Sequence, residues 1–437
     1  FGSRLKSVKP NASLLLAMNC CVSRCLQRRV LCPSRVFNIV QLGALETGKV
    51  RRFAGTFALS EDRLNEFLKA EVSYFATHEP EPVSIRTIID ASTPEAVADL
   101  ALKELPIRYA HRIQQIELLP GWRSSPDIVE VHGLYSAAFR DLRLTEWEKG
   151  DELHDFTETI QVLKQRFKMV IPRLAMGMRA LQKSQCFSEA YIQEWLDIFL
   201  LSRIGTEMLT SQYIATLKSM TGARGQPSIV NPACDPAAIC EQAAKHARKL
   251  TKQHYFLKES VQIFVETEVS PAMADPQGRI RFSYVPQYLF YVMLELLKNS
   301  ARATVENSAS ASVLHEKPII ITVGADESQV AIRLSDRANG IPFSVADKVW
   351  SYMYSTAPKN DTGDFTAEGT PLAGYGVGLP LSRLYARYLG GSLSLMSMPG
   401  IGTNGYLYLK RIESEAKENV PLSSLSSLSS LGEPQMF

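Results

Sequence analysis

The stretch that decides the fold is Leu294-Glu295-Leu296-Leu297-Lys298-Asn299-Ser300-Ala301-Arg302-Ala303-Thr304. At the 3.6-residue period of an α-helix, one face carries Glu295, Asn299 and Arg302, with Lys298 at its edge. Another face is apolar and carries Leu294, Leu297 and Ala301. The pattern therefore predicts a helix that packs by its apolar residues and presents a carboxylate, an amide and two cations together.

This combination of polar groups is suited to a phosphorylated ligand with a metal ion. Carboxylate and amide oxygens are ligands that Mg²⁺ accepts, whereas Lys and Arg side chains suit phosphate. Burying such a face without a ligand would be costly. The helix is therefore predicted to form one wall of a nucleoside triphosphate site.

Length and composition indicate an ordinary globular protein. The 437 residues allow two or three domains, and the hydrophobic fraction of 45% and charged fraction of 21% are typical of soluble chains. The net charge of +3 gives no global basic signature of nucleic-acid binding. No apolar run approaches the length of a membrane span.

The N-terminal segment differs from the rest of the chain. Residues 1–45 contain no Asp or Glu but carry several Arg and Lys residues, which is typical of a mitochondrial transit segment. A disordered basic tail is the alternative. Four of the seven cysteines lie in this segment, and the remaining three (Cys186, Cys234 and Cys240) have no spacing typical of a disulfide framework or a zinc site.

Residues 60–225 are predicted to form a helical bundle. Helical periodicity covers residues 60–75, 94–105 and 107–119, with Pro106 as an expected interruption, and then 126–142, 151–181, 188–204 and 205–220. Residues 221–228 are a predicted linker. We interpret the bundle as a scaffold and docking domain, and its histidines (His111, His132 and His154) as structural or solvent-facing by default.

Residues 235–412 combine strands with helices. Alternating apolar residues predict strands near 261–266, 319–324, 329–335, 392–398 and 405–410, and helices are expected at 235–255, 286–306 and 376–389. This order predicts an α/β sandwich in which a mixed sheet has helices on one face, and an α+β fold for the whole chain. Residues 413–437, which contain repeated Leu-Ser-Ser, are expected to be a disordered tail.

Three further motifs accompany the helix. Asp336 ends a predicted strand and is followed by a turn with Gly340, an arrangement that suits a buried acceptor for an exocyclic amine such as that of adenine. A long segment at about 343–373 contains Ser355 and Thr356 and is a candidate lid. Alternate glycines then precede a helix in Gly374-Tyr375-Gly376-Val377-Gly378-Leu379, where backbone amides can approach oxyanions. A Rossmann loop is the competing interpretation, but it would lie near the start of its domain.

Glu295 to Asn299 resembles the N box of the GHKL ATP-binding fold, which histidine kinases, Hsp90-type chaperones, type II topoisomerases and MutL proteins share. The longer run from Glu295 to Glu306 resembles the mitochondrial protein kinases that phosphorylate 2-oxoacid dehydrogenase complexes. Glu104-Leu-Pro-Ile-Arg108 and Leu200-Leu-Ser-Arg203-Ile204 in the bundle are similar to segments of the same family. The resemblance covers roughly residues 60–412.

The resemblance implies roles for the motif residues. Glu295 would be the general base and Asn299 the ligand of Mg²⁺, while Lys298 and Arg302 would position the phosphates of ATP and favour the charged form of Glu295. Asp336 would bind adenine, and Thr403 would make the last nucleotide contact. The nucleotide site would be completed by Leu296, Leu297, Ser300, Ala301, Gly340, Ser355, Thr356, Gly374, Tyr375, Gly376, Val377, Gly378 and Leu379.

The implied function is an ATP-dependent serine kinase of the mitochondrial matrix. Family members phosphorylate the E1 alpha subunit of a 2-oxoacid dehydrogenase, bind the lipoyl domain of its E2 core through the bundle, and usually form a homodimer. Ser355-Thr-Ala-Pro favours the pyruvate dehydrogenase branch, whereas Tyr291, where that branch usually has His, favours the branched-chain dehydrogenase branch. Two other hypotheses remain open: a noncatalytic adaptor that binds nucleotide and lipoyl domains, and a GHKL histidine autokinase.

Family glycines are replaced by Ala338 and Asn339 in the turn after Asp336. Asn tolerates left-handed backbone and Ala does so poorly. The shape of this loop is therefore a specific question for the structure.

Overall fold

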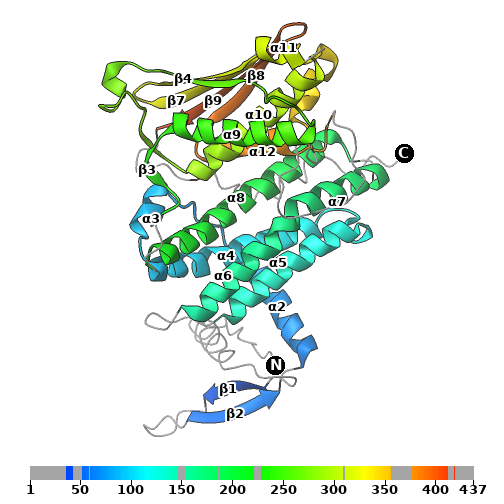
Figure 1. The fold of residues 1–437 in the computed structure, drawn as a ribbon. Coiled ribbons are helices and arrows are strands. Elements are labelled where there is room, and N and C mark those ends of the chain that lie inside the picture. The colour runs from blue at the N-terminus through cyan, green and yellow to red at the C-terminus, as the bar shows by residue number, and fades with distance from the viewer. Residues whose placement is uncertain are drawn as a thin grey trace, which may run out of the picture.

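The protein is described by a computed structural model that covers residues 36–42, 52–58, 60–145, 153–185, 187–220, 228–308, 311–355, 376–411 and 418. A bundle of long helices makes up the first half, and a sheet covered by helices on one face makes up the second (Figure 1). These two parts meet where α8 of the bundle (Glu189–Met220) packs against α12 of the sheet domain (Gly378–Tyr388).

The first described element is a two-stranded antiparallel hairpin below the bundle (Figure 1). Strand β1 (Val36–Leu42) pairs with β2 (Arg52–Ala58), with Val36 opposite Ala58. Residues 36–42 lie within the predicted transit segment of residues 1–45, and the alternative of a disordered tail is wrong for them because their backbone groups are paired in a ladder. The targeting prediction for residues 1–35 lies outside the described residues.

The bundle runs from residue 61 to residue 220. Its helices are α2 (Glu61–Phe75), α3 (Ile85–Asp90), α4 (Pro94–Glu117), η1 (Trp122–Ser124), α5 (Pro126–Leu144), α6 (His154–Arg166), η2 (Phe167–Met169), α7 (Val170–Gln185) and α8. Side-chain oxygens cap the first three: Ser60, Ser84 and Thr93 accept backbone N–H bonds at the starts of α2, α3 and α4. The helix periodicity of the sequence is confirmed.

Three predicted helix boundaries differ from the structure. Helix α4 continues through Pro106, which the sequence predicts as an interruption, because buried packing on both sides of the proline compensates for the lost backbone bond. Helix α8 likewise continues through Gly205, where two helices are predicted. In contrast, the stretch 151–181 is broken by the short 3₁₀ turn η2 into α6 and α7.

The second part contains two sheets. Strands β3 (Asn231–Cys234) and β5 (Phe282–Tyr284) form a small antiparallel pair. The main sheet has the order β4-β6-β7-β9-β8 and comprises β4 (Ile263–Glu268), β6 (Ile319–Ala325), β7 (Gln329–Asp336), β9 (Gly402–Lys410) and β8 (Ser392–Met398). The helical elements of this part are α9 (Pro236–His254), η3 (Pro271–Met273), α10 (Pro286–Glu306), α11 (Ala311–Glu316), η4 (Phe343–Trp350) and α12.

The main sheet is mixed and one-sided. Strands β4 and β6 are parallel, and the other three neighbouring pairs are antiparallel. Helices α9, α10 and α12 cover one face (Figure 1), where Ile321, Ile332 and Leu407 are buried. The predicted α+β fold with a mixed sheet is therefore confirmed. Among the described helices, none is long and apolar enough to cross a membrane.

A buried ion pair joins the two parts and the C-terminal segment. Arg108 of α4 and Glu418 form an ion pair in which both side chains are almost fully buried. Tyr388 at the end of α12 donates a hydrogen bond to the same carboxylate, and the backbone N–H of Val83 donates to it at 2.8 Å. Gly205 of α8 leaves room for this cluster, because a Cβ there would overlap the Arg108 guanidinium.

The C-terminal residues 413–437 are predicted to be disordered, and for Glu418 this is wrong. Burial of the Arg108 cation requires a counter-charge, and Glu104 on the same helix provides only a longer contact of 3.5 Å. Burial raises the pKa of the Glu104 carboxyl, whereas the Arg108 cation opposes this shift. Glu418 is therefore the closer partner of Arg108, and its carboxylate bonds connect α4 to α12.

We predict that Glu418→Ala lowers the free energy of unfolding by about 3–5 kcal/mol, because it leaves a buried cation without its closest partner. Urea denaturation of the full chain measures the change. The control Asp90→Ala removes an exposed ion pair with Arg86 and should cost less than about 1 kcal/mol. Equal effects of the two substitutions would contradict the structural role of Glu418.

Candidate nucleotide-binding site

Helix α10 places polar groups on a largely buried scaffold. The helix starts at Pro286, a position where a backbone N–H would have no hydrogen-bond partner within the helix, so proline is tolerated there. The helix packs through residues such as Leu289 and Val292. Asn299 is exposed, although Lys298 and Ser300 on either side of it are buried. The side chain of Asn299 is therefore open to a ligand while its helix is held by the core.

Glu295 and Lys298 form a buried ion pair one helical turn apart. The Nζ of Lys298 donates to Oε1 of Glu295 at 2.8 Å, and the two residues are 3% and 9% exposed, respectively. The sequence predicts that Lys298 faces the phosphates, but its nearest anion in the structure is Glu295. Each of the two buried groups therefore has a partner of opposite charge.

Tyr291, one turn before Glu295, occupies the position where pyruvate dehydrogenase kinases usually have His. Burial, with the neighbouring Glu295 carboxylate, raises the pKa of the Tyr291 phenol, so that it stays protonated at neutral pH. Its ring packs against Tyr385 of α12 with 4.8 Å between ring centres. Lys298, and not residue 291, therefore supplies the charged partner of Glu295.

The glycine turn before α12 lies directly against Glu295. Gly376 has a φ of +76°, a left-handed conformation that favours glycine. A Cβ on Gly378 would overlap Oε2 of Glu295, so the backbone approaches this carboxylate as closely as glycine allows. The N-terminus of α12, with its positive potential and free backbone amides, therefore lies beside Glu295.

Asp336 is held at the end of β7 by three hydrogen bonds. Its Oδ1 accepts the backbone N–H groups of Ala338 and Thr403, both at 3.1 Å, and its Oδ2 accepts the Ser300 hydroxyl at 2.7 Å. A carboxylate offers about four acceptor positions. One position on Oδ2 therefore remains for a donor such as an exocyclic amine.

The loop after Asp336 adopts the backbone that the family glycines would allow. The left-handed positions are Asn339, with a φ of +70°, and Gly340, with a φ of +69°, whereas Ala338 is not among the described residues with positive φ. A Cβ on Gly402 would overlap the backbone carbonyl of Asp336. The replacement of family glycines by Ala338 and Asn339 is therefore compatible with the loop.

Other predicted site residues are placed differently. Leu296, Leu297 and Ala301 belong to the hydrophobic core, so we assign them to the packing of α10 and not to ligand contact. Arg302 forms an ion pair with Glu306 at 3.2 Å, one turn further along the helix. The apolar environment of the sheet, which sequence periodicity alone does not define, decides which faces of α10 are buried.

The candidate lid is described only at its start. Residues 343–350, the first part of the predicted range of 343–373, form η4, and Ser355 is exposed at the end of the described segment. Val377 and Leu379 flank Gly378 and are half-buried. The remaining predicted residues of this region, Thr356, Gly374 and Tyr375, lie outside the described residues.

The donor set fits a magnesium ion that is shared with phosphates. Within the described ranges, no group of three His, Cys, Asp or Glu residues could hold a metal ion on its own. Mg²⁺ is commonly bound through one or two protein oxygens together with phosphates and water. The exposed amide of Asn299 lies on α10 between Glu295 and Ser300, which bonds Asp336, and it is compatible with this kind of binding.

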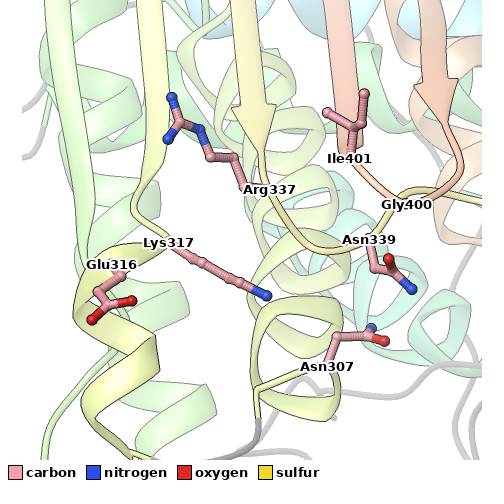
Figure 2. Close-up of a pocket in the computed structure, with 7 residues that line it drawn as sticks. All are labelled: Asn307, Glu316, Lys317, Arg337, Asn339, Gly400 and Ile401. Atoms are coloured by element: carbon pink, nitrogen blue, oxygen red, sulfur yellow. The ribbon is translucent and has the colours of Figure 1, made fainter.

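A polar pocket lies beside the loop that follows Asp336, and residues of this loop line it (Figure 2). It has a volume of about 530 Å³ and is lined by Asn307, Glu316, Lys317, Arg337, Asn339, Gly400 and Ile401. Lys317 extends toward Asn307 in the figure, whereas Arg337 points away from it. Neither Glu295 nor Gly378 lines this pocket, so it is distinct from the site between α10 and α12.

Comparisons with known proteins agree with this geometry. Residues 82–232 match the family described as mitochondrial branched-chain alpha-ketoacid dehydrogenase kinase, and residues 284–412 match the histidine kinase-, DNA gyrase B- and HSP90-like ATPases. The rat mitochondrial pyruvate dehydrogenase (acetyl-transferring) kinase isozyme 4 is 34% identical over 80% of this chain and 86% of its own length. The mitochondrial pyruvate dehydrogenase kinase of Drosophila melanogaster is 31% identical over 85% of this chain and 92% of its own length.

The chain belongs to the mitochondrial 2-oxoacid dehydrogenase kinase family. It is therefore a protein kinase with a GHKL-type ATP-binding domain. The human isozyme 4, 32% identical over 80% of this chain, carries the same kinase name. The expected interaction of Lys298 with Glu295 is present as an ion pair, whereas sequence reasoning missed the Ser300–Asp336 bond. That bond joins distant elements, so no local spacing indicates it.

We predict that Gly378→Ala lowers both ATP affinity and turnover by about tenfold or more, because the added methyl group displaces Glu295 or the start of α12. ATP binding by calorimetry and the rate of phosphoryl transfer measure the effect. Gly133→Ala is the matched control, since no atom lies within 4 Å of a Cβ at this helical position. Wild-type behaviour of Gly378→Ala would contradict the close approach of α12 to Glu295.

Proposed function

We propose that this kinase transfers the γ-phosphoryl group of ATP to a serine of the E1 alpha subunit of a mitochondrial 2-oxoacid dehydrogenase, and thereby inactivates that complex. The observation that carries the proposal is the placement of Glu295 against Gly378 at the start of α12. On its own helix, α10, Glu295 lies one turn before the exposed amide of Asn299. A carboxylate, a metal ligand and a phosphate-binding turn are the parts that phosphoryl transfer requires.

Glu295 is the proposed general base. Lys298 holds Oε1 at 2.8 Å, so the second oxygen, Oε2, faces the turn where the terminal phosphate would lie. From this position it would accept the proton of an incoming serine hydroxyl. Proton removal and the positioning of the two reacting oxygens are the contributions that this chain would make to the transfer.

Asn299 and Asp336 are proposed to bind the two ends of ATP. Asp336 would accept the exocyclic amine of adenine on Oδ2, where a lone pair remains. The amide of Asn299 would bind a Mg²⁺ ion that neutralises charge on the phosphates as the bond to the leaving group breaks. Backbone amides from Gly376 to Gly378, with Thr403, Ser355 and Thr356, are proposed to complete the nucleotide contacts.

The names of the relatives support a proposed location and substrate. Those named above are mitochondrial kinases whose names give pyruvate dehydrogenase as the substrate. We propose the mitochondrial matrix as the location of this chain, and pyruvate dehydrogenase as the substrate in preference to the branched-chain complex. Tyr291 supports the branched-chain alternative. The bundle is proposed to bind the lipoyl domain of the E2 core.

A homodimer is proposed to form through the open face of the main sheet. Apolar side chains on this face are exposed, with Phe264 at 50%, Met396 at 65% and Met398 at 59%. Helices cover the opposite face (Figure 1). Exposed apolar groups on a sheet suit burial against a second copy. Sedimentation of the intact chain tests this proposal, which a monomer at micromolar concentration would contradict.

We predict that Glu295→Gln lowers the rate of phosphoryl transfer by at least about 10²-fold, because glutamine cannot accept the proton. ATP binding should stay within about tenfold, or ~1.4 kcal/mol. Radiolabel transfer and calorimetry measure the two effects. The control Glu306→Gln changes a more exposed carboxylate of the same helix and should leave transfer within about twofold. Unimpaired transfer by Glu295→Gln would exclude it as the base.

We predict that Asn299→Ala removes most of the gain in ATP affinity that Mg²⁺ provides, a loss of about tenfold or more. Calorimetric titrations with and without Mg²⁺ measure this gain. Asn307→Ala removes an exposed amide from the end of the same helix and should keep the gain. An unchanged Mg²⁺ dependence in Asn299→Ala would exclude the amide as a metal ligand.

The substrate is tested by incubating the full chain with purified pyruvate and branched-chain dehydrogenase complexes and Mg-ATP, then mapping the labelled residue. Acid-stable label on an E1 alpha serine of one complex supports the proposal and selects the branch. ATP binding without transfer would indicate a noncatalytic adaptor, and acid-labile label on the chain itself would indicate a histidine autokinase. Of the candidate acceptors, His111 is buried, with its Nε2 2.8 Å from the carbonyl of His78, which disfavours the last outcome.

A further inference from the structure

The bundle makes three polar contacts with the segment between η4 and residue 353. Gln193 of α8 donates to the backbone carbonyl of Trp350 at 2.9 Å, and Arg179 of α7 donates to that of Met353 at 3.1 Å. Tyr352 donates its hydroxyl to Oδ1 of Asp197 on α8 at 2.6 Å. All three contacts join the bundle to the sheet domain, and the residues that they reach lie within the stretch 350–353.

The same short segment is bonded to the glycine turn of the ATP site. The backbone N–H of Met353 donates to the carbonyl of Gly376 at 2.9 Å. A Cβ on Gly376 would lie 2.6 Å from the carbonyl carbon of Met353, so the two backbones are in contact at a position that requires glycine. Both residues have left-handed backbone, with φ of +65° for Met353 and +76° for Gly376. A displacement of Met353 would therefore displace the turn.

The contact between Tyr352 and Asp197 involves a buried tyrosine side chain. Tyr352 is only 6% exposed, so its hydroxyl has little access to water as an alternative partner. Burial raises the pKa of the Asp197 carboxyl, while the Tyr352 hydroxyl and two arginines of α12, Arg387 and Arg383, oppose this shift. Arg383 also lies over the Trp350 ring, 5.2 Å from its centre. Asp197 therefore faces both the 350–353 segment and the helix that follows the glycine turn.

We propose that Asp197 and Tyr352 are positioning residues for the phosphate-binding turn. They act through Met353 and Gly376, and they touch neither ATP nor the protein substrate. The proposal rests on the proposed function, because it assigns the turn at Gly376–Gly378 to the phosphates of ATP. It also gives the bundle a part in nucleotide binding, since Asp197 belongs to α8, a helix of the docking domain.

The proposal separates the two ends of the nucleotide. Adenine would be bound by Asp336, whose three hydrogen bonds involve Ser300, Ala338 and Thr403 and none of the residues in the 350–353 segment. A shift of the turn should therefore weaken binding of the phosphates while binding of the base is kept. A loss of overall stability would instead weaken every ligand together.

The experiment measures the dissociation constants of Mg-ATP, ADP and adenosine for the full-length Tyr352→Phe variant by competition calorimetry. Removing a buried hydroxyl that bonds a carboxylate should raise the constant for Mg-ATP about tenfold. The constant for ADP should rise less, and that for adenosine should stay within about twofold. Tyr191→Phe removes a phenol hydroxyl from α8, the helix that carries Asp197, where the Tyr191 ring stacks on Phe187, and serves as the matched control.

Asp197 variants test whether the effect passes through the bond. Asp197→Ala should match Tyr352→Phe, and the double variant should be no worse than either single one, because both remove the same interaction. Asp197→Asn keeps an acceptor oxygen for the Tyr352 hydroxyl and should bind Mg-ATP within about twofold of the unaltered chain.

Several results would overturn the proposal. Unchanged Mg-ATP affinity in Tyr352→Phe, equal weakening of all three ligands, or additive effects in the double variant each contradict it. Absence of ATP binding by the unaltered chain would contradict both this proposal and the proposed function. The two proposals can also fail separately. If the variant loses phosphate binding selectively but the unaltered chain phosphorylates neither dehydrogenase complex, the positioning role is supported and only the proposed function is overturned.

Discussion

The burial of helix α10 is the constraint on which the rest of the structure depends. Most of its side chains pack against α9, α12 and the sheet, yet one turn carries the Glu295–Lys298 pair and the exposed amide of Asn299. Charges so close to a core are tolerated only when they are paired or bonded. Lys298 pairs with Glu295, and Ser300 bonds Asp336, so the helix holds both ends of the candidate site. Packing and chemistry are therefore properties of the same helix.

The contacts between the two parts of the chain have a common helix, α8. Near its middle, Gly205 makes room for the ion pair between Arg108 and Glu418. Closer to its start, Asp197 binds Tyr352 beside the glycine turn. Because one helix carries both contacts, it connects the interior of the bundle to the segment beside the candidate nucleotide site.

Departures from the family pattern have local compensations. The His that pyruvate dehydrogenase kinases usually place before the proposed general base is Tyr291 here, and Lys298 supplies the partner of Glu295. Ala338 takes the place of a glycine without needing left-handed backbone, since Asn339 and Gly340 adopt it. In each case a neighbouring residue provides the charge or the conformation that the replaced residue would have given.

The sequence by itself determined the helical bundle, the mixed sheet, and the nature of the site. Helical and strand periods are local properties, and the residues from Glu295 to Asn299 belong to one short segment whose spacing defines their shared face. Only the tertiary structure decided how Pro106 continues a helix, which faces of α10 enter the core, and that Glu418 meets Arg108. Each of these depends on contacts between distant segments, where burial outweighs local preference. The bond from Asp197 to Tyr352 is of the same kind, because no pattern within either segment indicates its partner.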